Sequence, residues 1–179
     1  MRHVGGDMAL APVTDPRHRI GTVLLATDLS PASTAATDQA IDLAIQLGAR
    51  LLIVNVMDPG RGGLRRHREP IRPVEERRDR AEVAQKIAER ARTDGADATF
   101  LVWEGDVGDG ILAAADAEHA DLIVVGSRGR SGVGRYLLGS VSDQIVHRAR
   151  CPVLVVRPDR DDGAEPVEEA HPGPVTAVH

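Results

Sequence analysis

Residues 121–142, DLIVVGSRGRSGVGRYLLGSVS, decide how this chain folds. A continuous apolar run at 122–125 ends at Gly126, and further glycines follow at positions 129, 132 and 134. Gly139 and Ser140 then precede a polar helical pattern. The stretch predicts a buried parallel strand, a loop whose glycines expose backbone N–H groups, and the N-terminus of a helix. Such an arrangement is suited to holding an anion, most simply a phosphate.

Two earlier apolar runs predict the first part of the same sheet. Residues 22–26 (TVLLA) and 51–56 (LLIVNV) are typical of buried strands. Between them, Ser30-Pro31 predicts a helix start with serine as the N-cap, and Gly48 suits the left-handed position that ends a helix. A strand, a helix and a strand in this order predict a right-handed βαβ unit.

The second half of the chain continues the alternation. We expect helices over residues 74–93, 109–118 and 140–148, and strands over residues 98–102, 121–125 and 153–156. Ser140 and Asp143 are spaced as in a capping box, with Asp in place of the usual Glu. Five apolar strands alternate with four helices, which predicts an α/β fold with a parallel sheet. Periodicity does not give the order of the strands.

The sequence predicts one domain, at residues 19–158. Residues 1–18 carry no sustained periodicity, and we expect a flexible leader there. Residues 159–179 are acidic and Pro-rich, and we expect this tail to be disordered. Within the domain, residues 58–73 form a Gly/Pro/Arg-rich segment that is long enough for a functional loop.

Composition narrows the class of protein. The formal net charge of −5 and an aromatic content of 2% argue against a nucleic-acid binder. The single cysteine, Cys151, excludes an intramolecular disulfide and is interpreted as a small buried hydrophobe. No apolar run approaches the roughly 18 residues that suggest a membrane span, and the N-terminal segment lacks the core of a signal peptide. We therefore expect a soluble, cytoplasmic protein with no membrane partner.

The spacing Gly126-x2-Gly129-x9-Gly139-Ser140 resembles the nucleotide-binding signature of the universal stress protein (UspA-like) family, in its ATP-binding branch. The resemblance extends over about residues 20–157. It implies a single doubly wound domain with the strand order 3-2-1-4-5 and helices on both faces. The first and fourth strands would then lie side by side at the topological switch point, where open α/β sheets bind ligands.

The resemblance also implies a set of nucleotide-binding residues. Asp28, in the strand-end motif Ala26-Thr27-Asp28, would contact the ribose or the adenine, and the backbone of Val56 would meet the adenine edge. The remaining candidates would surround the phosphates, with the arginine neutralising their charge: Gly126, Arg128, Gly129, Gly139, Ser140, Val141 and Ser142. ATP is the implied ligand, and Mg or Mn would accompany it through the phosphates alone.

Three of these assignments, and the expected assembly, have structural alternatives. Asp28 could organise the turn into the first helix, since Asx turns are common at such positions. Val56 could be an ordinary core valine, and Ser140 a plain N-cap. The last strand, which the resemblance pairs with its copy in a homodimer, could instead be shielded in a monomer by the acidic tail or by a neighbouring loop.

Three functions are compatible with these residues. The first is a regulatory nucleotide-binding module of the stress response. The second is an enzyme that hydrolyses ATP slowly; dedicated catalysis is disfavoured because the single lysine, Lys86, is far from the glycine loop and no Walker motif occurs. The third is an interaction protein with an empty pocket. Nucleotide carried through purification would distinguish the first function from the third.

Overall fold

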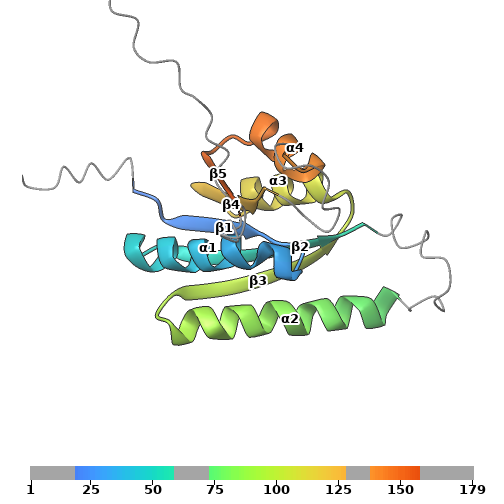
Figure 1. Cartoon of the computed structure of the whole chain (residues 1–179), viewed down its shortest axis with the longest axis horizontal. Helices are drawn as coiled ribbons and strands as arrows, with labels where there is room; N and C mark the ends of the chain where they lie inside the picture. Colours follow the sequence, from blue (N-terminus) through green and yellow to red (C-terminus); the bar gives the residue numbers. More distant parts are fainter. Residues whose placement is uncertain (1–18, 59–72, 128–137, 158–179) are drawn as a thin grey trace, which may run out of the picture.

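The computed structural model describes residues 19–58, 73–127 and 138–157. Its centre is a five-stranded sheet of β1 (Thr22–Ala26), β2 (Arg50–Met57), β3 (Asp97–Glu104), β4 (Leu122–Gly126) and β5 (Val153–Val156). The strands pair in parallel in the order β3-β2-β1-β4-β5 (Figure 1). This confirms the doubly wound α/β fold. The predicted leader and tail, and most of the predicted 58–73 loop, lie outside the described residues.

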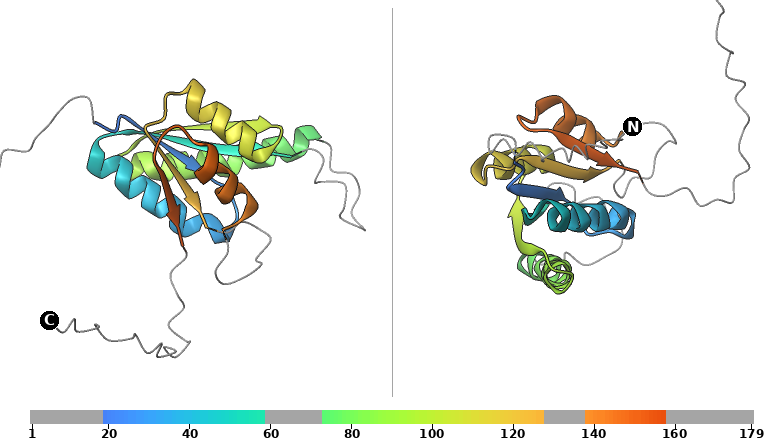
Figure 2. Two further views of the ribbon diagram at one scale, coloured as in Figure 1. Left: turned by 90° about the horizontal axis from the view of Figure 1, so that it is seen from above. Right: turned by 90° about the vertical axis from the view of Figure 1, so that its left-hand side faces the viewer.

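Helices cover both faces of the sheet. A short 3-10 helix, Pro31–Ser33, leads into the first of four α-helices: α1 (Thr34–Leu47), α2 (Pro73–Thr93), α3 (Val107–Ala117) and α4 (Ser140–Arg148). Val23 and Leu25 of β1 pack on the side of α1 and α2, whereas Leu24 and Ala26 pack on the side of α3 and α4. The turned views separate α1 from α3 on opposite faces (Figure 2). After Thr22 the central strand is apolar, because both of its faces are buried.

The predicted ends of the first helix are largely correct. Pro31 occupies the first position of the 3-10 helix, and Ser30 precedes it in extended conformation without a side-chain capping bond. Gly48 has a φ of 60°, the left-handed conformation that glycine adopts at little cost. The helix therefore ends where the sequence predicts, although it begins through a 3-10 turn.

Other boundaries differ from the predictions for local reasons. The third strand extends beyond residues 98–102 to Asp97 and Glu104, because its ladder with β2 is eight residues long. The third helix begins at Val107, two residues early, because the Asp106 side chain accepts a hydrogen bond from the Asp109 N–H at 3.0 Å and caps it.

The predicted capping box at Ser140 is wrong. Gly139 is the N-cap of α4, and Ser140 is the first helical residue. Gly139 has extended dihedral angles (φ −63°, ψ 153°), and its carbonyl accepts the first helical bond from the Asp143 N–H at 2.9 Å. Capping depends on this backbone geometry rather than on residue type alone. Ser140 is consequently exposed on the first turn of the helix.

The amino end of the sheet is held by Asp121. Its carboxylate accepts the N–H groups of Gly21 at 2.8 Å and Thr22 at 3.0 Å, which ties the start of β1 to the start of β4. The loops that could bind a ligand lie at the opposite end of the sheet, where β1 and β4 end. Within the described residues, none of the helices has both the length and the apolar character needed to cross a bilayer.

Candidate functional site

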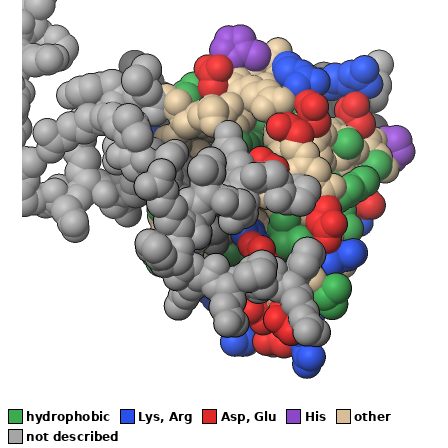
Figure 3. All heavy atoms as spheres, turned by 90° about the vertical axis from the view of Figure 1, so that its right-hand side faces the viewer, with side chains coloured by type: hydrophobic (Ala, Val, Ile, Leu, Met, Phe, Trp, Pro, Cys, Tyr) green, Lys and Arg blue, Asp and Glu red, His purple; other side chains and the backbone are tan. Residues whose placement is uncertain are grey.

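The candidate site lies at the carboxyl ends of β1 and β4. Ala26 and Val125 are partners in the β1–β4 ladder, so the segments that follow them begin side by side. This is the switch point of the sheet, because the chain leaves β1 toward one neighbour and returns through β4 on the other side. Figure 3 views the molecule from the side where β2 ends and α2 begins. Acidic and basic side chains are intermixed over the described part of this face.

Thr27 fixes the start of the loop after β1. Its N–H donates to the Val54 carbonyl at 3.0 Å, and its hydroxyl accepts the Leu29 N–H at 3.0 Å. The Thr27 and Ser33 hydroxyls lie 2.9 Å apart. Because the Ser33 hydroxyl donates to the Ser30 carbonyl at 2.7 Å, Thr27 must be the donor in this pair. The threonine is buried, and its backbone and side chain both hold the loop in one conformation.

Asp28 organises the turn, as the structural alternative expected. Its Oδ1 accepts the Ser30 N–H at 3.0 Å and the Ser30 hydroxyl at 2.7 Å, which is the pattern of an Asx turn. Leu29, between them, has a φ of 60°, which costs a non-glycine residue about 1–2 kcal/mol. Strain of this kind persists only where surrounding bonds impose it, and it is concentrated at functional sites. The turn role does not by itself exclude a ligand role, because each carboxylate oxygen can accept more than one hydrogen bond.

The N-terminus of α4 is fastened to the end of β4. The Gly139 N–H donates to the Ser127 carbonyl at 2.9 Å, and the Ser127 N–H donates to the Val156 carbonyl at 2.7 Å. The first intrahelical bond is donated by Asp143, so the N–H groups of residues 140–142 precede the helical ladder. These groups and the positive end of the helix dipole form an anion-binding arrangement.

The three predicted residues in the first turn of α4 differ in their surroundings. The Ser140 side chain is exposed, and Val141 packs partly against the core. The Ser142 side chain is buried, and its hydroxyl donates to the Gly139 carbonyl at 2.9 Å. A ligand could therefore meet the Ser140 hydroxyl, whereas Ser142 offers its main-chain N–H.

The other predicted residues are distributed as follows. Gly126 is the last residue of β4 and pairs with Val156 of β5. The Val56 side chain is buried beneath α3: a Cβ added to Gly110 would come within 2.9 Å of it. The side chain is thus an ordinary core valine, as the alternative expected. The contact of the Val56 backbone with the adenine edge remains a prediction. Arg128 and Gly129 lie outside the described residues.

Sequence reasoning missed Asn55. This side chain is 1% exposed in the middle of a buried strand, and its amide donates to the Thr27 carbonyl at 2.8 Å. The signal was the one polar residue in the run LLIVNV, since buried polar side chains are expected to be hydrogen-bonded. Asn55 therefore joins β2 directly to the loop of the candidate site.

A hollow of about 270 Å³ lies at the other end of the sheet, near Cys151. Its lining includes the carboxylates of Asp116 and Asp121, and Asp116 pairs with Arg150 at 3.2 Å. These carboxylates make the hollow a poorer site for a phosphate than the N-terminus of a helix, although His119 and Arg150 also line it. Burial raises the pKa of the Cys151 thiol, which agrees with its interpretation as an unreactive side chain. Across the described ranges, no cluster of three His, Cys, Asp or Glu side chains could hold a metal ion.

Known proteins share both the sequence and the fold. A universal stress protein of Thermus aquaticus is 40% identical over 138 residues, covering 76% of this chain and 98% of the relative. UspA of Lactobacillus plantarum has the same fold, with a TM-score of 0.64 at 24% identity, covering 78% of this chain and 99% of that one. A crystal structure of a universal stress protein in complex with cAMP is 29% identical, with a TM-score of 0.60, and covers 78% and 98% of the two chains.

The model of the universal stress protein family matches residues 19–157, which span the whole sheet and all its helices. The match includes both loops of the candidate site and ends at the last strand. This chain therefore belongs to the universal stress protein family.

Proposed function

We propose that this stress-response protein binds ATP between the loop after β1 and the N-terminus of α4, and that it acts as a regulatory module. The observation that carries the proposal is the hydrogen bond between Ser127 and Gly139. It brings the N-terminus of a helix to the end of the strand that pairs with β1, and so into the neighbourhood of Asp28. A group that binds phosphate and a group that binds ribose would thus lie near one another.

The phosphates would lie against the first turn of α4. The main-chain N–H groups of residues 140–142 and the Ser140 hydroxyl are donors suited to phosphate oxygens. Gly139 lacks a Cβ, which allows the ligand to approach the backbone closely. Gly126 and Gly129 would serve in the same way, and Arg128 would neutralise phosphate charge.

The nucleoside would lie toward β1 and β2. We assign Ala26, Thr27 and Asp28 to its ribose side and the backbone of Val56 to the adenine edge. Support comes from the solved universal stress protein in complex with cAMP, which is also an adenine nucleotide. A Mg or Mn ion would accompany the ATP. The phosphates and water would be its ligands.

The remaining parts of the proposal concern assembly and location. We expect a homodimer through β5, because this strand is last in the sheet order and its four residues are all apolar. A single cysteine suits the reducing cytoplasm. We assign no dedicated catalytic role, and hydrolysis of ATP, where it occurs, is expected to be slow.

The direct test is the identity of the nucleotide that leaves the freshly purified protein on denaturation. Mass spectrometry is expected to find ATP, and calorimetry on the stripped protein is expected to give tighter binding of ATP than of GTP. Release of no nucleotide, together with no heat of binding for ATP, would instead indicate an interaction protein with an empty pocket.

A further inference from the structure

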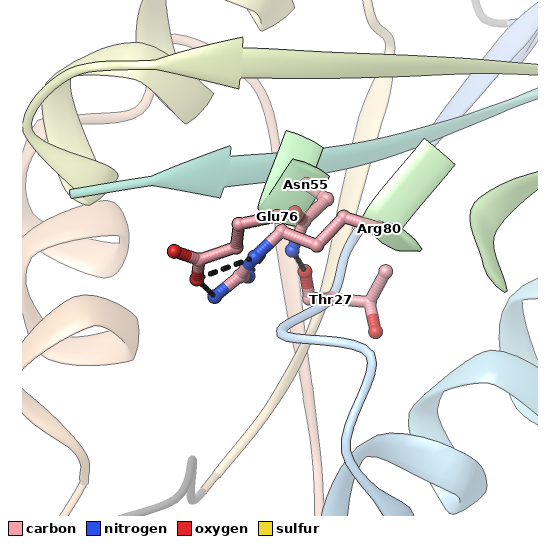
Figure 4. A network of polar contacts seen from close by, with 4 residues as sticks. All are labelled: Thr27, Asn55, Glu76 and Arg80. Atoms are coloured by element: carbon pink, nitrogen blue, oxygen red, sulfur yellow. Dashed lines mark hydrogen bonds and ion pairs between the residues drawn. The ribbon is translucent and has the colours of Figure 1, made fainter. Parts of the chain in front are cut away.

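The loop after β1 is linked to α2 through one main-chain carbonyl and three side chains, and Figure 4 shows the four residues. The Asn55 amide donates to the Thr27 carbonyl at 2.8 Å. Arg80 donates to the Asn55 side-chain oxygen at 3.4 Å and forms an ion pair with Glu76 at 2.9 Å. We call Thr27, Asn55, Arg80 and Glu76 the loop relay. It joins three separate parts of the chain: the end of β1, the middle of β2 and the start of α2.

The chemistry of the partners allows one orientation of the Asn55 amide. A guanidinium can only donate and a carbonyl can only accept, so Oδ1 must face Arg80 and Nδ2 must face Thr27. The Arg80 side chain is only 18% exposed, and its charge is balanced by Glu76 one helical turn earlier. Arg80 thus fixes the amide that in turn fixes Thr27.

The held carbonyl controls the position of Asp28. The Thr27 carbonyl and the Asp28 N–H belong to one planar peptide group, so holding the oxygen sets the plane from which Asp28 begins. From the other side, the Asp28 carboxylate is held by Ser30. The strained φ of Leu29 shows that the loop is kept in a conformation that its local sequence alone does not favour.

We propose that Asn55 and Arg80 are positioning residues of the nucleotide site, which hold the Thr27–Asp28 peptide so that Asp28 can receive ribose hydroxyls. The inference rests on the proposed function and adds to it a dependence on α2, which contributes Arg80 and Glu76. A substitution in the first turns of α2 should therefore alter the affinity for a nucleoside, although the substituted residue does not contact the ligand.

The test compares Asn55→Leu and Arg80→Met with a matched control, Arg92→Met. Arg92 lies on the same helix and also donates to a backbone oxygen, the Ala98 carbonyl at 2.8 Å, but on β3. In the nucleotide-free full chain, NMR measures hydrogen exchange at the amides of Leu29 and Ser30. Both relay variants are expected to raise this exchange about tenfold, with the larger effect in Asn55→Leu, and the control is expected to leave it unchanged.

The second measurement is ribose discrimination by calorimetry with ATP and 2′,3′-dideoxy-ATP. The unmodified protein is expected to favour ATP by about tenfold, as suits hydroxyls that donate to a carboxylate. The relay variants are expected to reduce this ratio to about two. Their affinity for ATP should fall, whereas their affinity for the dideoxy compound should stay the same. A merely structural defect would weaken both ligands alike.

The two possible failures are distinguishable. If the unmodified protein binds neither compound, the proposed function has failed and this inference with it. If it binds and discriminates, but the relay variants discriminate equally well or leave the exchange of Leu29 and Ser30 unchanged, the positioning role is overturned while ATP binding stands. The buried Asn55→Leu substitution could prevent folding. Arg80→Met then still allows the measurement, because methionine keeps most of the apolar stem of the arginine side chain.

Discussion

The Ser127 carbonyl accepts the Gly139 N–H at 2.9 Å, so the two ends of the glycine-rich segment meet in one hydrogen bond. Ser127 also donates to β5 through its own N–H, which anchors the junction in the sheet. The first turn of α4 is thus held at the carboxyl end of β4 by backbone groups.

Gly139→Ala is expected to weaken ATP binding about tenfold, because a Cβ enters the space that the phosphates need. Gly139 has a φ of −63°, which alanine adopts readily. No backbone strain therefore arises, but alanine is a less favourable N-cap than glycine, so the free energy of unfolding should fall by no more than about 1 kcal/mol. Calorimetry and thermal melting measure the two effects.

The matched control for this variant is Gly21→Ala at the opposite end of the sheet. A Cβ there would lie 3.5 Å from the Asp121 carboxylate, an ordinary contact. ATP affinity is expected to be unchanged. If both alanine variants bind ATP as tightly as the unmodified protein, Gly139 does not lie against the phosphates.

Asp28→Asn separates the two roles of this carboxylate. The asparagine oxygen can still accept the Ser30 N–H and preserve the turn, but it loses the charge that strengthens bonds from ribose hydroxyls. We expect ATP binding to weaken about tenfold with little change in melting temperature. Asp28→Ala should lose stability as well as affinity. An Asp28→Asn protein that binds ATP normally would leave Asp28 with the turn role alone.

The fluorescence of Trp103 is expected to change when the adenine of ATP binds. It is the chain's only tryptophan, it is 43% exposed, and it is the ladder partner of Val56, to which we assign the adenine edge. Adjacent strands lie about 4.8 Å apart, so a bound base would alter the surroundings of the indole. ATP should change the tryptophan emission, whereas inorganic triphosphate should not. Unchanged emission under conditions where calorimetry detects ATP binding would place the base elsewhere.

Val155→Pro is expected to convert a homodimer to a monomer. The carbonyls of Pro152 and Val156 accept bonds from β4, so by alternation the N–H of Val155 points away from β4 toward the outer edge. Proline removes this donor and leaves the β4 ladder in place. Leu154→Pro, which removes a donor facing β4, should instead destabilise the fold. Light scattering that gives a monomer mass for the unmodified protein, well above micromolar concentration, would reject the interface.

The Cys151 thiol is expected to react slowly with alkylating reagents at pH 8. Burial raises its pKa, and the carboxylates of Asp121 and Asp116 act in the same direction. The reactive thiolate is therefore scarcer at pH 8 than in a free thiol, and the rate should continue to rise at higher pH. Alkylation followed by mass spectrometry measures this, with glutathione as the reference. A rate equal to that of glutathione would contradict the raised pKa.

Much of the fold could be predicted because its strands are short apolar runs between clear breaks. β1 and β5 match their predicted residues one for one. The end of β3 could not be predicted in this way, because Trp103 and Glu104 are exposed on an outer strand and belong to it through the ladder with β2. The strand order came from the resemblance to a family, since it depends on pairings between distant segments.

The candidate site was predictable where it depends on residue type and not where it depends on backbone geometry. The glycine spacing predicts the start of α4 correctly, but it does not predict the cap, because the extended conformation of Gly139 has no sequence signature of its own. Asn55 was missed because the partner that orients it, Arg80, lies 25 positions away. Long-range polar contacts of this kind become visible only once the helices are packed.

The central place of β1 has a consequence for the growing chain. The Gly21 N–H meets the Asp121 carboxylate across 100 positions of sequence, so β1 lacks its second neighbour until β4 has been made. At about 5–20 residues per second, ribosomes need roughly 5–20 s to add that length. Throughout this interval the nascent protein carries an unpaired edge on its central strand, and it is then that chaperones would find a surface to bind.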